Sequence, residues 1–464
     1  MTNTLSAPVI DTKGKLPQFW EGDVIFFANL LELFFGNEKE TNELEEIVGE
    51  VDSYGGRLVP ILNLLFRGKN NLSVLERHSA GVLNQYFEQE LGLSLPRTEI
   101  MSPDNYRLVG EALAQNETSL VQDRLSTIAD HGAYWIDGYV TDGTLTGIAT
   151  SLGKKTVTTQ EGCWKGNNKL LLHQFLESQT LPTPPTCLAN HKTEILSCMA
   201  ELSQAGFDEV VLKSQIGASG IGILRVKKIG TFDEARLIDI PEHLFYEGPV
   251  MVQGWLSPDR PGIQAIKSPS VQMFLDEKSV WLFDITEQIL SRDSVHEGNV
   301  SPPPYLSRIA GAREELFRQA TLAGQWLHDQ GYRGTASTDF LFVERDDSSL
   351  PDVYVCEINA RVTGATYPCL LARHFTPDGH WLMQNLRLKQ PMGGAELLII
   401  LQEAGLLFQK GDEVGILPIN FNFGSDEQVH KGQFLCLAPS HEVCWNLLEK
   451  AEQMLPVEWQ ADRD

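Results

Sequence analysis

Three polar residues at alternate positions, Glu357, Asn359 and Arg361, are the first candidates for chemistry in this chain. They lie in the segment Val353–Pro368, VYVCEINARVTGATYP, whose start is rich in β-branched and aromatic residues and predicts a strand. Alternate residues of a strand share one face, so the three side chains should point the same way. A carboxylate and an amide are hard oxygen ligands that suit Mg²⁺, and a nearby arginine can stabilise developing negative charge. The alternative is an ordinary strand with a polar outer face.

A second carboxylate, Asp339, lies in the preceding predicted strand, Gly334–Glu344. The connecting segment Glu344–Asp352, ERDDSSLPD, is typical of a hairpin turn. The two strands should therefore be antiparallel neighbours. This places Asp339 and Glu357 close enough to bind one metal ion.

Two lysines lie at the ends of predicted elements. Lys169 begins a predicted helix whose apolar pattern runs from Leu170 to Leu176. Taken alone, such a lysine is usually a solvated surface residue. Lys213 ends the predicted strand Val210–Lys213, where it can reach a phosphate as a point charge.

The segment Ser214–Gly220 follows Lys213 and is rich in glycine. Gly217 and Gly220 remove side-chain bulk, so that backbone N–H groups can surround phosphate oxygens, and Ser219 adds a hydroxyl. The segment joins two predicted strands, whereas a P-loop or a dinucleotide fingerprint leads from a strand into a helix. A plain hairpin turn is an equally good interpretation.

Two further segments carry candidate binding residues. The apolar strand Pro249–Pro258 ends in Gln253, Trp255 and Leu256, which could present backbone groups and an indole wall to a purine base. A core strand is the alternative. The segment Ser291–Pro304 is predicted to be a polar loop and carries Arg292, His296 and Asn299.

Length and composition limit the class of protein. A chain of 464 residues favours two or three domains. Its net charge of −25, from 62 acidic and 37 basic residues, argues against general binding to nucleic acid or anionic membranes. The start lacks a signal-peptide pattern, and no segment has the apolar length of a membrane span. The seven scattered cysteines favour buried free thiols in a reducing cytosol over disulfides or catalysis.

The order of predicted elements indicates α/β and α+β parts. Short apolar strands alternate with helical segments over about the first 150 residues, where no chemical motif is found. After Pro368 the chain predicts a helical segment at Trp381–Leu386 and a helix at Gly393–Phe408. Two short strands and an amphipathic helix at Glu442–Met454 complete a small α+β tail.

The order of these features resembles the ATP-grasp superfamily of carboxylate ligases over about residues 160–375. A lysine at the start of a helix is followed by a second lysine with a glycine-rich strand–loop–strand. A hinge strand, a strand that carries an aspartate and finally the ExNxR motif complete the order. The resemblance implies a pre-ATP-grasp α/β domain at 1–155, an ATP-grasp domain of two α+β subdomains that clamp ATP at 156–390, and a small α+β C-terminal subdomain at 391–464. EINARVTGATYP with TEQIL and HEGN is similar to the pheganomycin-type peptide ligase branch.

The resemblance also implies residue roles. Arg361, with Lys213, would be catalytic, and Arg292 and His296 would bind the substrate. Asp259 would be the candidate ribose ligand. Mg²⁺ would be bound by Asp339, Glu357 and Asn359, and ATP by Lys169, Lys213, Gly217, Ser219, Gly220, Gln253, Trp255 and Leu256.

The expected activity is that of an ATP-dependent carboxylate–amine ligase, which forms an amide or peptide bond on a small metabolite through an acyl phosphate. The expected cofactors are ATP and Mg²⁺, and the expected partners are a carboxylic acid and an amine or amino acid. The protein is expected in the cytoplasm and is not expected to bind nucleic acid or membranes. Relatives with this architecture are often dimers. The alternatives are a carboxylate–thiol ligase of the same fold and an inactive ATP-binding regulatory protein.

Overall fold

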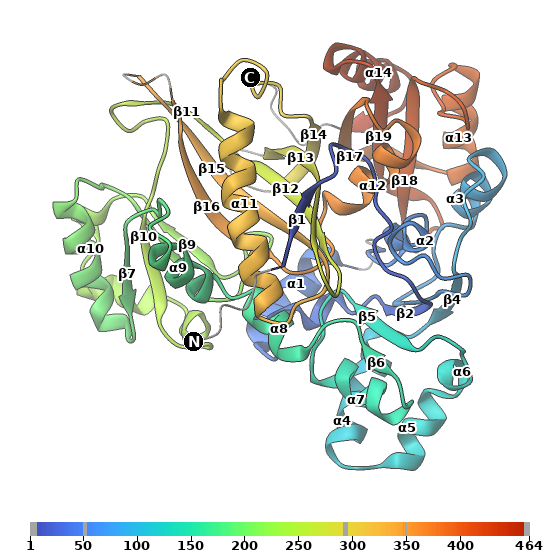
Figure 1. Ribbon diagram of the computed structural model, residues 1–464, viewed down its shortest axis with the longest axis horizontal. Coiled ribbons are helices and arrows are strands. Elements are labelled where there is room, and N and C mark those ends of the chain that lie inside the picture. The colour runs from blue at the N-terminus through green and yellow to red at the C-terminus, as the bar shows by residue number, and fades with distance from the viewer. Residues whose placement is uncertain (1–6, 50–52, 291–295, 347, 349, 459–464) are drawn as a thin grey trace.

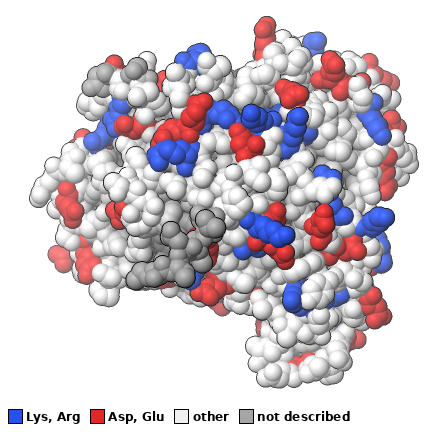
Figure 2. Space-filling model, viewed as in Figure 1, with Lys and Arg blue, Asp and Glu red and all other residues white. Residues whose placement is uncertain are grey.

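The computed structural model describes residues 7–49, 53–290, 296–346, 348 and 350–458, which form three β-sheets surrounded by helices (Figure 1). No helix within these ranges is long and apolar enough to cross a membrane. On the face in Figure 2, Lys and Arg side chains lie among Asp and Glu side chains and form no single large basic surface.

The N-terminal part is organised around a five-stranded parallel sheet of order β4-β3-β2-β5-β6. All four residues of its central strand, VIFF, are buried, as expected for a parallel strand covered on both faces. The strands are β2 (Val24–Phe27), β3 (Leu72–Leu75), β4 (Arg97–Ile100), β5 (Trp135–Gly138) and β6 (Lys155–Thr156). The helices are η1 (Leu30–Phe34), α1 (Glu38–Val48), η2 (Gly56–Leu58), α2 (Leu62–Leu65), α3 (Gly81–Gln85), η3 (Tyr86–Glu90), α4 (Pro103–Ala114), α5 (Thr118–Arg124), α6 (Ser126–Ala129) and α7 (Gly143–Ser151).

A four-stranded antiparallel sheet of order β7-β10-β8-β9 follows in the chain. Its strands are β7 (Thr186–Ala189), β8 (Val210–Lys213), β9 (Ile223–Val226) and β10 (Val250–Gly254). The accompanying helices are α8 (Gln160–Gly166), α9 (Lys169–Ser178), η4 (Lys192–Glu194), α10 (Ile195–Gln204), η5 (Ile229–Thr231), η6 (Glu234–Asp239) and η7 (Glu242–Phe245). Because β8 and β9 pair antiparallel, the glycine-rich segment joins two strands, as predicted from sequence.

The third sheet is mainly antiparallel and has eleven strands. Its main path is β11-β15-β12-β13-β14-β17-β19-β18, with β16 paired to β15, β1 to β13 and β20 to β17. The strands are β1 (Val9–Asp11), β11 (Ile263–Lys267), β12 (Pro269–Leu275), β13 (Val280–Leu290), β14 (His296–Ser301), β15 (Gly334–Arg345), β16 (Asp352–Asn359), β17 (His380–Met392), β18 (Gly415–Phe423), β19 (Val429–Ala438) and β20 (Val457–Glu458).

Four helices accompany this sheet. The long helix α11 (Ala312–Asp329) lies across β12, β13, β15 and β16 (Figure 1). The others are α12 (Thr366–Phe375), α13 (Gly394–Glu403) and α14 (His441–Met454). One apolar core joins N-terminal residues such as Phe26 with C-terminal residues such as Phe421. The mixed α/β and α+β architecture expected from the sequence is therefore confirmed.

Three local expectations were wrong. Trp381–Leu386 is part of strand β17, because this apolar segment pairs with β14 and β19. The predicted loop Ser291–Pro304 contains strand β14, whose polar residues pair with β13 and β17. Two of the seven cysteines, Cys187 and Cys198, form a disulfide, so only the other five are free thiols.

Candidate active site

The two candidate carboxylates lie opposite each other on neighbouring strands. β15 and β16 pair antiparallel with Asp339 against Glu357 and Ser337 against Asn359, as the hairpin pattern predicted. The two oxygens of Asp339 accept hydrogen bonds from Ser270 Oγ at 2.6 Å and from Asn359 Nδ2 at 2.9 Å. Strand register therefore brings together the three residues proposed from sequence as metal ligands.

The pKa values of the two carboxylates are shifted in opposite directions. Burial, and then the charge of Glu357, raise the pKa of Asp339 above its ordinary value. Burial acts in the same direction on Glu357, but Lys169 and Arg361 together hold the pKa of Glu357 below its ordinary value. A site with two adjacent carboxylates favours a cation, because a cation removes the repulsion between them.

Arg361 lies beyond the end of β16, so strand alternation does not place it. Its Nη1 donates a hydrogen bond to Asn167 Oδ1 at 2.5 Å, and Asn167 also accepts one from the backbone of Ala360 at 3.2 Å. Asn167 comes from the turn between α8 and α9 and is buried. The sequence analysis did not identify Asn167, whose only signal is its position just before Lys169.

Lys169 reaches the carboxylate site from the first position of α9. Its ammonium group lies 3.1 Å from Glu357 Oε2 and donates a hydrogen bond to the carbonyl of Gly217 at 2.8 Å. The residue is 8% exposed, which is unusual for a lysine without a specific role. Lys169 therefore links the carboxylates to the glycine-rich segment.

Lys213 lies at the end of β8 and is also 8% exposed. Its ammonium group donates to Gln253 Oε1 at 2.8 Å and lies 4.0 Å from the thiol of Cys356. Gln253 in turn donates to Thr186 Oγ1 at 2.9 Å. A small cavity lined by residues that include Lys169, Lys213, Gln253 and Cys356 connects these groups.

Trp255 and Leu256, the other two residues expected to bind adenine, lie just past the end of β10. The guanidinium of Arg225 stacks over Trp255, 4.4 Å from the ring centre. Leu256 packs against the apolar core of the four-stranded sheet. Neither residue lines the cavity at Lys213, so their contact with a base stays a prediction.

The glycine-rich segment folds back against its own strands. The backbone N–H of Ser214 donates to the carbonyl of Gly222 at 2.8 Å. Ser219 and Gly220, at the exposed tip, have φ of 54° and 85°, which favours glycine and small polar residues. Gly217 is buried, and its carbonyl binds Lys169.

A buried glutamate that the sequence did not indicate lies behind this segment. Glu40, from α1, is fully buried, and neither of its carboxylate oxygens has a hydrogen-bond partner in the described part of the chain. A Cβ placed on Gly222 would lie 2.9 Å from Glu40 Oε1, so α1 packs directly on the segment. Burial, and then the charge of Glu247, raise the pKa of Glu40 to about 7.

The candidate acceptor-side residues are only partly covered by the structure. His296 lies on β14, where its Nε2 is 2.7 Å from Asn299 Oδ1 and its ring packs on Gly364, just after Arg361. Arg292 lies outside the described residues. Asp259 is exposed in the turn after β10, and its role stays a prediction.

The metal-ligand set contains only two acidic residues. Among the described residues, no group of three or more His, Cys, Asp or Glu side chains could hold a metal ion. Asp339, Glu357 and Asn359 supply two carboxylates and one amide, so further ligands would have to come from elsewhere, such as nucleotide phosphates or water.

Comparisons with known proteins identify the fold of this chain. No family model matches the chain. A curated relative, the [butirosin acyl-carrier protein]–L-glutamate ligase of Niallia circulans, is 26% identical over 248 residues. The match covers 53% of this chain and 55% of the relative, so it spans about half the length of each.

Solved structures match nearly the whole chain. An ADP complex of N5-carboxyaminoimidazole ribonucleotide synthetase is 13% identical, with a TM-score of 0.51, over 97% of this chain and 98% of that one. The biotin carboxylase domain dimer of Hydrogenobacter thermophilus 2-oxoglutarate carboxylase, with MgADP and bicarbonate, is 12% identical. Its TM-score is 0.56 over 95% of this chain and 91% of that one. Both are ATP-grasp enzymes, and this chain has the ATP-grasp fold.

Proposed function

We propose that this chain, with its ATP-grasp fold, is an ATP-dependent ligase that joins a carboxylic acid to an amine through an acyl phosphate and releases ADP and phosphate. The observation that carries the proposal is the ion pair between the buried Lys169 and the partly buried Glu357, 3.1 Å apart, beside Asp339 and Arg361. Buried charges are costly unless they have a role, and this set matches the needs of phosphoryl transfer.

The chemistry follows from the donor and acceptor groups. A carboxylate is a poor acyl donor until one of its oxygens is phosphorylated by ATP. Lys169 and Lys213 supply positive charge to the phosphates. Lys213 is bound by the neutral amide of Gln253, and Lys169 can exchange its ion pair with Glu357 for one with a phosphate oxygen. After the amine attacks the acyl phosphate, Arg361 stabilises the negative oxygen until phosphate leaves. The segment Ser214–Gly220 excludes water that would hydrolyse the intermediate.

The carboxylate site fits a magnesium ion. Asp339, Glu357 and Asn359 are oxygen donors on adjacent strands, and repulsion between the two carboxylates favours a bound cation. When bound there, Mg²⁺ would neutralise phosphate charge during transfer. Lys169 would then exchange Glu357 for a phosphate oxygen.

The remaining assignments complete the proposal. Gln253, Trp255 and Leu256 hold the adenine, Gly217, Ser219 and Gly220 cover the phosphates, and Arg292 and His296 bind the acceptor. The reaction takes place in the cytoplasm, where ATP is available, on small-molecule acids and amines. A homodimer is proposed because a structural neighbour is described as a dimer.

A carboxylate–thiol ligase is the second candidate function. It is favoured by the curated relative, whose name pairs an acyl-carrier protein with L-glutamate. Both candidates share the acyl phosphate and differ only in the attacking group. A regulatory protein that only binds ATP has no need of Arg361 beside the carboxylates.

The test is release of ADP and phosphate from ATP and Mg²⁺ across a matrix of acids, including L-glutamate, with amines or thiols. ADP formed only when an acid and an amine are both present supports the amine ligase. ADP formed with an acid and a carrier-protein thiol supports the second candidate. AMP formation, or no turnover despite ATP binding, would contradict the acyl-phosphate proposal.

A further inference from the structure

The carboxylate of Asp339 is held by side chains from both neighbouring strands. On one side, Ser270 of β12 lies opposite Asp339 in the sheet and donates its hydroxyl to Oδ1 at 2.6 Å. On the other side, Asn359 of β16 donates its Nδ2 to Oδ2 at 2.9 Å. The hydroxyl of Ser337, on the same strand as Asp339, is a more distant donor to Oδ1 at 3.4 Å. Each carboxylate oxygen is therefore fixed from a different side.

The hydroxyl that binds Asp339 is itself oriented by a second residue. Gln272, two residues further along β12, donates its Nε2 to Ser270 Oγ at 2.9 Å. An ionised carboxylate can only accept hydrogen bonds, and a serine hydroxyl has a single proton to donate. The hydrogen bonds therefore run in one direction, from the amide of Gln272 to Ser270 and from Ser270 to Asp339.

This arrangement has a cost in stability. Ser270 is 2% exposed and Gln272 is fully buried. The amide oxygen of Gln272 has no hydrogen-bond partner among the residues that the structure describes. A buried acceptor without a partner costs about 1–3 kcal/mol, which an apolar side chain at this position would avoid. The buried amide is therefore expected to have a role, and its hydrogen bond to Ser270 indicates that the role concerns Asp339.

The donors to Asp339 are neutral, unlike those of another carboxylate in the same sheet. Asp284 is bound by the guanidinium of Arg373 at 2.8 Å, whose positive charge cancels its own. The two hydroxyls and the amide that bind Asp339 fix its orientation and bring no positive charge. Such donors suit a metal ligand, because the negative charge stays available to the cation.

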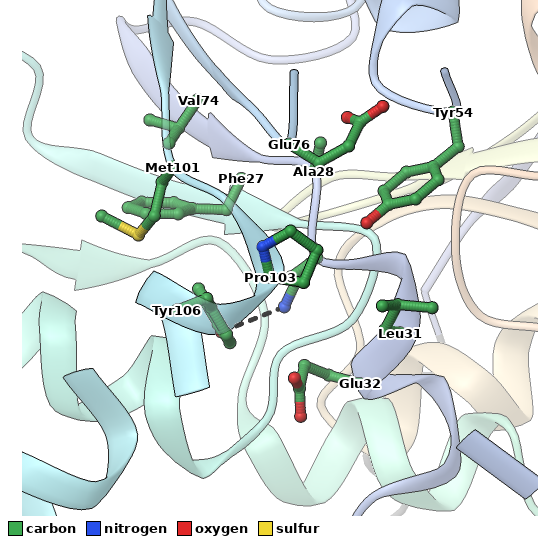
Figure 3. Close-up of a pocket in the computed structure, with 11 residues that line it drawn as sticks. Phe27, Ala28, Leu31, Glu32, Tyr54, Val74, Glu76, Met101, Pro103 and Tyr106 are labelled. Carbon is green, nitrogen blue, oxygen red and sulfur yellow. Dashed lines mark hydrogen bonds between the residues drawn. The ribbon is translucent and has the colours of Figure 1, made fainter. Parts of the chain in front are cut away.

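The acidic residues beside the small cavity in the N-terminal part are arranged differently. Glu32 and Glu76 line this cavity of about 20 Å³, and Figure 3 shows their carboxylates on opposite sides of the lining residues. Both oxygens of Glu76 accept hydrogen bonds from the backbone N–H of Gly55, at 3.0 and 3.2 Å. Asp339 and Glu357, in contrast, lie opposite each other on paired strands. The orientation of a carboxylate therefore matters for cation binding at Asp339 and not at this cavity.

We propose that Ser270, itself oriented by Gln272, is a positioning residue that holds Asp339 in the orientation needed to bind Mg²⁺. Both residues act through Asp339 and contact neither the metal ion nor the nucleotide. The inference rests on the proposed function, which assigns Mg²⁺ to Asp339. Loss of the Ser270 hydroxyl weakens metal binding and leaves metal-free nucleotide binding unchanged.

The test measures binding of ADP, which the chain cannot consume, so it does not depend on ligase activity. The Kd of ADP for the full chain is measured by titration calorimetry in EDTA and in excess Mg²⁺, and the ratio of the two values reports the contribution of the metal ion. Ser270→Ala should lower this ratio about tenfold, with the Kd in EDTA unchanged. Gln272→Met keeps the length of the side chain, removes the amide and should lower the ratio about threefold.

Thr338→Val is the matched control. Thr338 directly precedes Asp339, but it pairs with the core residues Val271 and Ile358, and its hydroxyl has no partner within the described ranges. This variant should keep the wild-type Kd in both buffers. An unchanged ratio in Ser270→Ala, or an equal loss of affinity in EDTA and in Mg²⁺, would overturn the positioning role.

Asp339→Asn distinguishes failure of this inference from failure of the proposed function. It should remove the effect of Mg²⁺ on ADP binding. If Asp339→Asn shows the wild-type ratio, or if Mg²⁺ has no effect on the wild type, the metal site itself is contradicted, and the inference with it. If Asp339→Asn loses the effect and Ser270→Ala keeps it, only the positioning role of Ser270 is refuted.

Discussion

Replacing Glu40 with glutamine should stabilise the protein above neutral pH. Glu40 is fully buried against Gly222, and neither of its oxygens has a hydrogen-bond partner in the described ranges. Burial and the neighbouring Glu247 raise the pKa of Glu40 from 4.5 to about 7, with smaller opposing effects of Ser214 and Lys169. Glutamine keeps the shape of the side chain and cannot ionise.

The sign and size of the effect follow from proton linkage. The folded pKa lies above the unfolded pKa, so the folded state binds more protons between pH 4.5 and about 7. The free energy of unfolding therefore falls as pH rises through this window. A shift of this size corresponds to about 3 kcal/mol above pH 7, and this destabilisation is absent in Glu40→Gln. For a chain of 464 residues, it corresponds to an increase in Tm of about 3 °C.

The assay is calorimetric melting of wild type and variant at half-unit steps from pH 5 to pH 8.5. The two Tm values should agree near pH 5 and separate by about 3 °C at pH 8. Glu46→Gln, an exposed change on the same helix, is the control and should follow the wild type. A constant Tm difference at all pH values, or a variant less stable at pH 8, would refute the assignment of an ionised, unpartnered carboxylate.

Three further changes test the nucleotide site. Glu357→Gln should lower the rate of ATP cleavage by about 100-fold or more, with an unchanged circular dichroism spectrum, and substantial residual turnover would argue against Glu357 as a metal ligand. Lys213→Met removes the ammonium group that binds Gln253 and should weaken ATP binding at least about tenfold by titration calorimetry, whereas wild-type affinity would exclude it from phosphate contact. Gly222→Ala would place a Cβ 2.1 Å from Ser214 Oγ at a φ of 76°, so it should lower stability by about 1–3 kcal/mol, and an unchanged Tm would show that the strand end adapts freely.

The sequence predicted the parts of the site that depend on local pattern. Alternation and the hairpin connection correctly placed Asp339 opposite Glu357 on paired strands. The glycine-rich segment was also correctly placed between two strands. These are short-range relations, in which strand periodicity alone determines which side chains are neighbours.

Long-range contacts could not be predicted in this way. Arg361 and Asn167 are separated by 194 residues, and no periodic pattern links them. Glu40 meets Gly222 only because an N-terminal helix packs on a distant loop. Strand β14 was missed because its polar residues, which pair within the sheet, resemble those of a loop.

Isotope transfer is the most direct test of acyl-phosphate chemistry in this chain. An acid that supports ADP formation is labelled with ¹⁸O in its carboxylate, and the released phosphate is analysed by mass spectrometry. Phosphorylation of the carboxylate predicts one ¹⁸O atom in each phosphate formed with ADP. Unlabelled phosphate, or the label in AMP, would contradict the proposed activation by the γ-phosphate of ATP.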